Sequence, residues 1–450
     1  MLAQFFRTDQ DHCYVYDAMT NRILSVKKTV PCEDGKDAEK QILDAFHKRG
    51  LITDKPFAKV VWQNSFEKNL QAMQHGVPRL MLQLTRRCNL NCRYCVYSGN
   101  YAHMQPHADQ DMSEATIRKA INLFAAYCTD RKEVFVDMYG GEALLRLDLM
   151  MYTVRYSKEV LHDQKVSFRI TSNGLLLNNG VGKWLSENPE IQLTVTLNGP
   201  YHDAYRVTPG GQGSLAIILK NLKEIRQNYP AVWDRQIQFL SNIVHSGQLL
   251  PLKEFYEKEI GKPPVSITHI RAQHGNDVIR EILSEKEDPD RGAELKELFC
   301  RKNDAFLDAY FGNGIRAVHT RHIFDNDANA YVGSCFPLVD RIFVHCDGKL
   351  GICESACDKV IVGNIETGLN MPVLEKIYKG TTKLFYEKCK NCWAQRLCTI
   401  CLKDLFSEDG ELIDSIPDSF CKLSREYSLE QLKMYCKIAQ MDPNRMDAYD

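Results

Sequence analysis

The chain has 450 residues, which at about 150 residues per domain predicts two or three domains. Hydrophobic residues make up 44% and charged residues 26%, an ordinary globular composition that excludes wholesale disorder. The formal net charge of -1 argues against nucleic-acid binding through bulk charge. The sequence has neither an apolar run long enough to cross a bilayer nor a signal peptide, so we expect a cytoplasmic protein without membrane contact.

Cysteine is the unusual residue, with 17 copies that are unevenly spread. Three lie within 88–95, and ten lie between 335 and 436. In a reducing compartment, bunched cysteines are typical of metal ligands rather than of disulfides. The sequence therefore predicts metal-binding regions at 88–95 and beyond 335.

The first part of the chain, residues 1–75, has short runs that alternate apolar and polar residues, followed by a helical pattern at 38–52. This order predicts a small α+β unit. From 76 to 275, apolar strands alternate with longer helical stretches, which indicates parallel β/α units. We expect an α/β fold with a partial (β/α)6 barrel, a helical bridge over 276–334 and a cysteine-rich domain over 335–450. The six expected strands are 79–85, 133–139, 166–172, 191–197, 237–244 and 265–272.

The first cysteine cluster follows directly after the first expected barrel strand, where Cys88, Cys92 and Cys95 form a C-x3-C-x2-C pattern. Three thiolates can hold three irons of a [4Fe–4S] cluster and leave the fourth iron open. An open metal position is typical of a reactive site. The alternative is a zinc knuckle, but zinc requires four ligands and no fourth follows closely.

The segment RCNLNCRYC at 87–95 resembles the signature of the radical SAM enzymes, including an aromatic residue, Tyr94, before the last cysteine. The resemblance implies that S-adenosylmethionine binds the open iron and yields a 5′-deoxyadenosyl radical. It makes Cys88, Cys92 and Cys95 the expected catalytic centre. The second strand ends in Gly140, Gly141 and Glu142, which resemble the GGE motif that receives the amino group of S-adenosylmethionine.

The later strand ends supply further residues that the resemblance places around S-adenosylmethionine. Ser172 and Asn173 end the third strand, and Asn198 ends the fourth, where relatives usually have aspartate. Arg206 is a candidate for the carboxylate of S-adenosylmethionine. The alternatives are ordinary strand-end capping for Ser172 and Asn198, and a surface ion pair for Arg206.

The C-terminal cysteines resemble the SPASM extension of peptide-modifying radical SAM enzymes, with two instead of three residues before Cys401. The resemblance implies two auxiliary [4Fe–4S] clusters in addition to the first cluster. It assigns a first thiol group of Cys335, Cys353 and Cys401, and a second thiol group of Cys389, Cys392, Cys398 and Cys421. Cys346, Cys357 or a substrate thiolate could complete the first group. Two zinc sites are the alternative.

Two further segments indicate a peptide substrate. By position, residues 1–75 resemble the winged-helix-like element that captures the leader of a precursor peptide as an added strand. The segment Val96–Tyr101, followed by His107, resembles maturases that build thioethers in cysteine-rich peptides. Relatives carry arginine where this chain has Gln105, and packing around the loop is the alternative role for Tyr97, Tyr101 and His107.

The sequence thus predicts a radical SAM peptide maturase that joins a cysteine sulfur to a carbon, with flavodoxin or ferredoxin as electron donor. The nearest alternative is formylglycine formation, which needs a carboxylate such as Asp347 or Glu354. Carbon–carbon crosslinking, epimerisation and a non-catalytic zinc-binding scaffold also remain open.

Overall fold

The centre of the molecule is a curved sheet of six parallel strands in the spatial order β12–β11–β9–β8–β7–β5. The computed structural model describes residues 2–26, 36–62, 64–270, 275–284, 289–325 and 329–450. The predicted partial (β/α)6 barrel is confirmed, and the strand bounds lie close to those expected. They are β5 Arg79–Thr85, β7 Glu133–Gly140, β8 Lys165–Ser172, β9 Ile191–Thr196, β11 Ile237–Ile243 and β12 Ser266–His269.

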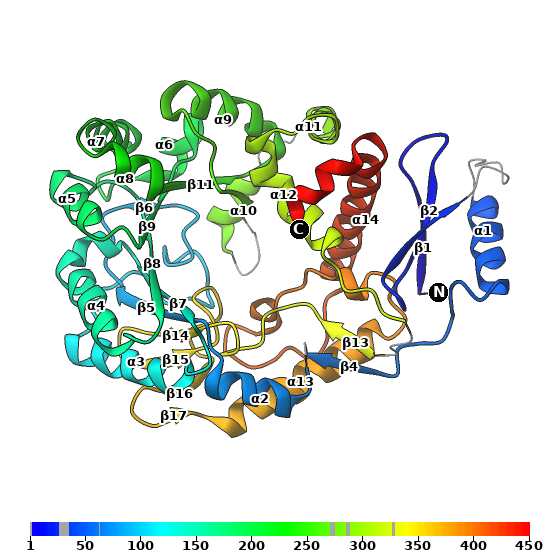
Figure 1. The fold of residues 1–450 in the computed structure, drawn as a ribbon, viewed down its shortest axis with the longest axis horizontal. Coiled ribbons are helices and arrows are strands. Elements are labelled where there is room, and N and C mark those ends of the chain that lie inside the picture. Colours follow the sequence, from blue (N-terminus) through cyan, green and yellow to red (C-terminus); the bar gives the residue numbers. More distant parts are fainter. Residues whose placement is uncertain (1, 27–35, 63, 271–274, 285–288, 326–328) are drawn as a thin grey trace.

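Helices cover the outer side of this sheet (Figure 1). They are α3 Glu114–Tyr127, α4 Leu147–Val160, α5 Asn179–Glu187, α7 Leu215–Asn228, α8 Pro230–Arg235 and α9 Leu249–Phe255. Leu80, Leu82 and Leu84 of β5 are fully buried in the core that includes Ile117 of α3. Because side chains alternate along a strand, Arg79 and the other odd-numbered residues of β5 face the inner side of the barrel.

The C-terminal region joins the barrel through its sheet. Strand β14 (Ile342–Val344) pairs in parallel with β5, and β15 (Lys349–Gly351), β16 (Ile361–Asn364) and β17 (Gly368–Leu369) continue the same sheet to ten strands. The bridge contains α10 Asp277–Leu283, α11 Pro289–Arg301 and α12 Ala305–His319, and the chain ends with α13 Met371–Cys389 and α14 Asp418–Met441. Strand β5, which precedes the first cysteine cluster, therefore belongs to the same sheet as β14 and β15, which lie next to Cys346 and Cys353.

The N-terminal segment forms a three-stranded antiparallel sheet, β1 Ala3–Arg7, β2 Cys13–Asp17 and β3 Arg22–Val26, followed by α1 Lys36–Lys48. It lies at the opposite end of the molecule from the barrel, beyond α14 (Figure 1). Strand β4 (Lys59–Trp62) is not part of this sheet but pairs with β13 (Asn329–Val332). Helix α2 (Phe66–His75) packs near α3. The small α+β unit therefore ends before β4.

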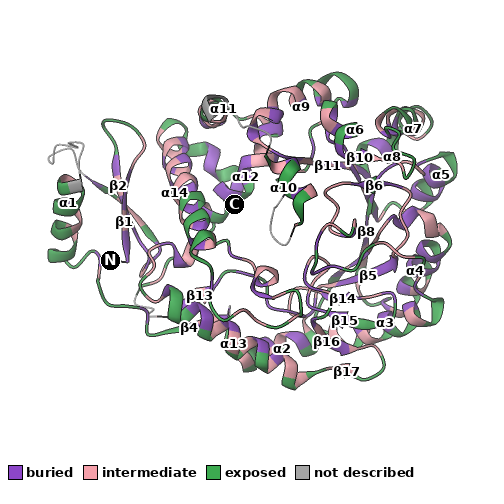
Figure 2. Ribbon diagram, turned by 180° about the vertical axis from the view of Figure 1, so that it is seen from behind, coloured by how far each residue is buried: buried purple, intermediate pink, exposed green. Residues whose placement is uncertain are grey.

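Burial follows this arrangement. Figure 2 shows the barrel strands largely buried, whereas α1 exposes most of its surface. Cys13 of β2 is disulfide-bonded, which departs from the expectation of free or metal-binding thiols, while the other described cysteines are free. No helix in the described part of the chain is both long and apolar enough to cross a bilayer.

Candidate active site

Three cysteine side chains converge in the loop that follows β5. Burial raises the pKa of Cys88 to about 11, that of Cys95 to about 12, and also that of Cys92, and the thiols influence one another electrostatically. Strand β6 (Asn91–Cys92) pairs with β10 (Arg206–Val207), so the backbone of Arg206 lies directly opposite Cys92. The structure thus places the thiols and a buried guanidinium side by side.

Gly140, the last residue of β7, and Gly141 after it allow the end of β7 to approach the end of β5 and the start of the cysteine loop. A side chain on Gly140 would come within 2.1 Å of the carbonyl oxygen of Thr85, and one on Gly141 within 2.2 Å of that of Arg87. In their place, backbone N–H groups donate to these carbonyls, from Gly141 to Thr85 at 2.9 Å and from Glu142 to Arg87 at 2.8 Å. Glycine is therefore required at both positions for steric reasons.

Glu142 is buried, and its carboxylate accepts hydrogen bonds from residues at the end of β8. Oε1 accepts from Ser172 Oγ at 2.8 Å and from the N–H of Leu144 at 3.1 Å, and Oε2 accepts from the N–H of Asn173 at 2.7 Å. Burial raises the pKa of Glu142 despite these bonds. The Asn173 amide in turn donates to Asn89 of the cysteine loop at 2.7 Å. Three of the predicted residues, Glu142, Ser172 and Asn173, therefore form one connected unit.

The fourth and fifth strand ends meet the cysteine loop at Tyr94. Its hydroxyl accepts from Asn198 Nδ2 at 2.9 Å, Arg206 Nη1 at 3.1 Å and Asn242 Nδ2 at 3.4 Å. His202 supports this side, because its Nδ1 accepts from the N–H of Asn198 and its Nε2 bonds Ser214 Oγ at 3.0 Å. Burial lowers the pKa of His202 to about 3, so the ring is neutral.

The segment after the loop packs against it. Tyr97 and Tyr101 are buried, with the Tyr97 hydroxyl donating to the carbonyl of Glu354 at 2.9 Å. His107 Nδ1 donates to the carbonyl of Arg86 at 3.1 Å, and its Nε2 lies 3.9 Å from Cys95 Sγ. Gln105 donates only its backbone N–H, to Asp358 at 2.7 Å. Both tyrosines thus pack beside the loop, and His107 borders the cysteine site.

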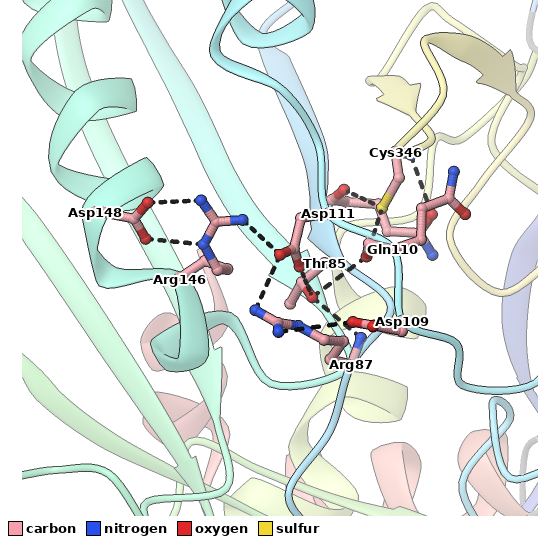
Figure 3. A network of polar contacts seen from close by, with 9 residues as sticks. Thr85, Arg87, Asp109, Gln110, Asp111, Arg146, Asp148 and Cys346 are labelled. Carbon is pink, nitrogen blue, oxygen red and sulfur yellow. Dashed lines mark hydrogen bonds and ion pairs between the residues drawn. The ribbon is translucent and has the colours of Figure 1, made fainter.

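A polar network braces the base of the loop (Figure 3). Asp111 accepts from Thr85 Oγ1 at 2.5 Å, from Arg87 Nη2 at 2.9 Å and from Arg146 Nη1 at 2.5 Å. Arg87 immediately precedes Cys88, and Arg146 ends the short helix that follows the GGE motif. One carboxylate therefore ties together the two segments that frame the site.

The second thiol group is assembled between α13 and α14. The pKa of Cys389 is raised by burial and by the neighbouring thiols of Cys398, Cys392 and Cys421. Ser424 Oγ lies 3.5 Å from Cys398 Sγ. The sequence spacing therefore corresponds to a spatial group of four.

The three members of the first thiol group influence one another electrostatically less than those of the second group do. Burial raises the pKa of Cys401, with Cys335 contributing, and Arg341 lies within electrostatic range of both Cys353 and Cys335. Arg341 Nη1 donates to both carboxylate oxygens of Glu354 at 2.9 Å.

The two spare cysteines lie elsewhere. Cys346 Sγ donates to the carbonyl of Gln83 at 2.9 Å, in the network of Figure 3, and Cys357 Sγ lies 3.9 Å from the carbonyl of Glu408. Neither thiol is among the groups that shift the pKa of Cys335, Cys353 or Cys401. Cys346 and Cys357 therefore contact backbone carbonyls rather than the members of the first thiol group.

The three thiols of the loop after β5 suit one iron–sulfur cluster, and the guanidinium beside them suits an anionic ligand. No group of His, Cys, Asp and Glu in the described part of the chain already has metal-ligand geometry, so the thiols are near neighbours without a closed site. Three thiols leave one iron of a [4Fe–4S] cluster open. Beside them, Nε of the buried Arg206 has no hydrogen-bond partner in the described structure. A buried guanidinium with an unused N–H next to the loop suits a carboxylate.

Sequence reasoning missed a charged group on the inner face of the barrel. Arg79 and Arg169 both lie against the ring of Phe135, and Arg79 Nε lies 3.5 Å from Asp137 Oδ2. Burial raises the pKa of Asp137 to about 6. The signal was present, because these residues interrupt apolar strands at alternate positions, which marks the face opposite the helices.

Comparison with known proteins agrees with this geometry. Residues 82–237 match the model of the radical SAM superfamily, so this part of the chain is a radical SAM domain. The chain is similar to the radical SAM cyclopropyl synthase TigE of Paramaledivibacter caminithermalis, 21% identical over 199 residues, or 42% of this chain and 41% of that protein. It is also similar to the cysteine-type anaerobic sulfatase-maturating enzyme of Clostridium novyi, 25% identical over 151 residues, or 32% and 39%.

The fold likeness extends further than the sequence likeness. The structure of anSMEcpe with bound AdoMet superposes with a TM-score of 0.60 at 18% identity, covering 83% of this chain and 98% of that one. The same protein with AdoMet and the Cp18Cys peptide gives a TM-score of 0.57 with the same coverage. The chain therefore has a radical SAM domain within a fold shared over most of its length, while each sequence match spans only about two fifths of the relative.

Proposed function

We propose that the protein is a radical SAM peptide maturase that joins a cysteine sulfur of a ribosomally made precursor to a carbon atom. The observation that carries the proposal is the convergence of Cys88, Cys92 and Cys95 with the GGE turn and the buried Arg206 at the carboxyl ends of the barrel strands. Active sites of barrel folds lie at this end. The likeness to anSMEcpe, a protein solved with a bound peptide, supports a peptide substrate.

In this proposal the two cofactors have separate roles. When bound, S-adenosylmethionine on a reduced [4Fe–4S] cluster would supply a 5′-deoxyadenosyl radical, and clusters held by the C-terminal thiol groups would take up the electron that thioether formation releases. Cys88, Cys92 and Cys95 hold the first cluster, while Arg206, Asn198 and the unit around Glu142 hold S-adenosylmethionine. The two C-terminal thiol groups hold the auxiliary clusters.

Joining a C–H carbon to a thiol removes two hydrogens. One leaves the carbon as a hydrogen atom, and the other leaves the sulfur as a proton while one electron departs. Asp137 suits the proton, because its buried carboxylate on the inner barrel face has one oxygen, Oδ1, without a hydrogen-bond partner among the described residues. The first thiol group has only three members, a number that leaves room for a substrate thiol.

Formylglycine formation is the second candidate, and Asp137 also favours it, since that reaction needs a proton acceptor as well. The carboxylates suggested from sequence suit the role less. Glu354 is paired with Arg341, and Asp347 is paired with Lys349 at 2.8 Å. The products distinguish the two reactions by mass.

The test is anaerobic reconstitution with dithionite and a cysteine-rich precursor peptide. We expect 5′-deoxyadenosine and a peptide that loses two hydrogens per bridge. Replacing Cys88, Cys92 and Cys95 together by alanine should abolish 5′-deoxyadenosine while iron bound by the C-terminal domain persists. Continued S-adenosylmethionine cleavage by the triple variant would contradict the assignment, and bound zinc without labile sulfide would favour the scaffold alternative.

A further inference from the structure

The hydroxyl of Tyr94 is the point where the cysteine loop meets two barrel strands. Asn198 follows β9, Asn242 lies on β11 and Arg206 begins β10, yet all three direct an N–H group at the same phenol oxygen. The donor–acceptor distances are 2.9, 3.1 and 3.4 Å. No other side chain in the described part of the site joins these three elements.

The two amides are oriented independently of Tyr94. Asn198 Oδ1 accepts from the backbone N–H of Asn242 at 3.0 Å, and Asn242 Oδ1 accepts from Thr268 Oγ1 at 2.8 Å. Each oxygen therefore has its own donor, and each Nδ2 must turn toward the phenol. The convergence of donors is built into the strand ends rather than imposed by the tyrosine alone.

The guanidinium depends on Tyr94 more strongly. Arg206 is buried, its Nη1 donates to the Tyr94 hydroxyl, and its Nε has no hydrogen-bond partner among the described residues. Without the phenol oxygen, Nη1 would lose the side-chain acceptor that it has among the described residues. Without that bond, the long side chain of Arg206 would gain rotameric freedom, and a ligand would have to restrict it on binding.

The donors exceed what the phenol can accept. A hydroxyl oxygen has two lone pairs, so three N–H groups cannot all be satisfied at once, and Arg206 Nε adds a further unused donor. Excess buried donors next to Cys92 and Cys95 mark a position for an oxygen-rich anion.

We propose that Tyr94 is a positioning residue whose hydroxyl holds Arg206 and Asn198 in place to receive the carboxylate of S-adenosylmethionine. The inference rests on the proposed function, because it takes S-adenosylmethionine as the ligand of the loop. It assigns to the hydroxyl a role that the aromatic ring alone would not have.

The test uses Tyr94→Phe, which keeps the ring and removes the oxygen. The reconstituted holoenzyme should bind S-adenosylmethionine about 10-fold more weakly by equilibrium dialysis, the cost of one hydrogen bond to a charged group. At saturating S-adenosylmethionine, the rate of 5′-deoxyadenosine formation should change less than about twofold, since the cysteines are untouched. Tyr101→Phe is the matched control, because it removes a hydroxyl from the same loop that donates to the backbone carbonyl of Tyr94 at 3.3 Å and leaves the Tyr94 hydroxyl in place.

A double-mutant cycle identifies the route of the effect. If Tyr94 acts through Arg206, the weakening caused by Tyr94→Phe should largely disappear in an Arg206→Lys background, whereas independent effects would multiply. Unchanged or tighter binding in Tyr94→Phe with full iron content would overturn the inference. So would an equal loss in Tyr101→Phe, which would indicate a general disturbance of the loop. A parent enzyme that binds no S-adenosylmethionine would instead refute the proposed function.

Discussion

On the inner face of the barrel, Asp137 presents a carboxylate that the fold buries with incomplete pairing. Its side chain is 9% exposed, and Arg79 lies 3.5 Å away on one side only. Burial outweighs the attraction of Arg79 and Arg169 and raises the pKa of Asp137 from 3.8 to about 6. The folded protein therefore retains a proton at pH values where the unfolded chain has released it.

We expect this group to lower stability as the pH rises from about 4 to 6, because over that range only the folded state binds the proton. Asp137→Asn cannot ionise and should raise the free energy of unfolding at pH 7 by up to about 3 kcal/mol, the limit set by the pKa rise. Chemical denaturation of the apoprotein between pH 4 and 7 measures this.

Asp347→Asn is the matched control, since Asp347 is more exposed and paired with Lys349. Parallel pH curves for Asp137→Asn and the parent would contradict the expectation. If Asp137 also takes the substrate proton, the stabilised variant should lose peptide modification while 5′-deoxyadenosine formation continues. A gain in stability with a loss of function is the pattern of a functional residue.

At this scale, the cysteines were predictable, and the roles of Asp111 and Asp137 were not. The short spacing of Cys88, Cys92 and Cys95 along the chain indicates metal binding. Asp111 owes its role to Arg87 and Arg146, and Asp137 to Arg79, which are distant in sequence or on another strand. A single sequence does not record which charges meet across a sheet.

The elements of the barrel were predictable because each strand is an apolar run followed by a helical pattern. Strand β5 was expected at 79–85 and lies there, and the helical stretch after it is α3, which begins at Glu114 after the Ser113 cap. The pairing of β14 with β5 and of β13 with β4 was not expected, because such pairs join segments more than 250 residues apart.

The N-terminal unit gives an element-scale prediction. Residues 1–55 contain the three-stranded sheet and α1, and much of their buried surface forms a core cluster of its own, although Leu2, Phe6, Tyr16 and Ala18 join the main core. Trp62 of β4 and Met73 of α2 are fully buried in that main core. Deleting 1–55, rather than 1–75, should therefore retain uncoupled S-adenosylmethionine cleavage and strongly reduce modification of the full precursor. Strand β3 is an edge of its sheet and could accept a leader strand.

The control for this deletion is the intact enzyme with a precursor that lacks its leader, which should show the same loss. Comparison of kcat/KM for the two peptides measures the effect. An unchanged kcat/KM for the full precursor with the truncated enzyme would rule out a leader-binding role.

For the whole molecule, the three [4Fe–4S] clusters that we propose would give about twelve iron atoms per chain. Removing Cys389 and Cys392 together should release about four iron atoms, because two of four ligands are lost. Cys346→Ser and Cys357→Ser should retain about twelve, since these thiols bond backbone carbonyls away from the first thiol group.

Iron and sulfide analysis of the reconstituted proteins measures these values. Loss of about four iron atoms in either serine variant would show that the thiol completes the first group, in which case that cluster has no position for a substrate.

The sharing of one sheet by β5 and β14 also has a consequence during synthesis. Strand β5 is complete at Thr85, but its neighbour begins at Ile342, about 260 residues later. At about 5–20 residues per second, the ribosome needs roughly 13–50 s to deliver it. Throughout that interval, one edge of a leucine-rich strand has open backbone groups that can pair with another chain. Nascent or truncated chains that end before β14 are therefore exposed to self-association, even though they contain all six barrel strands.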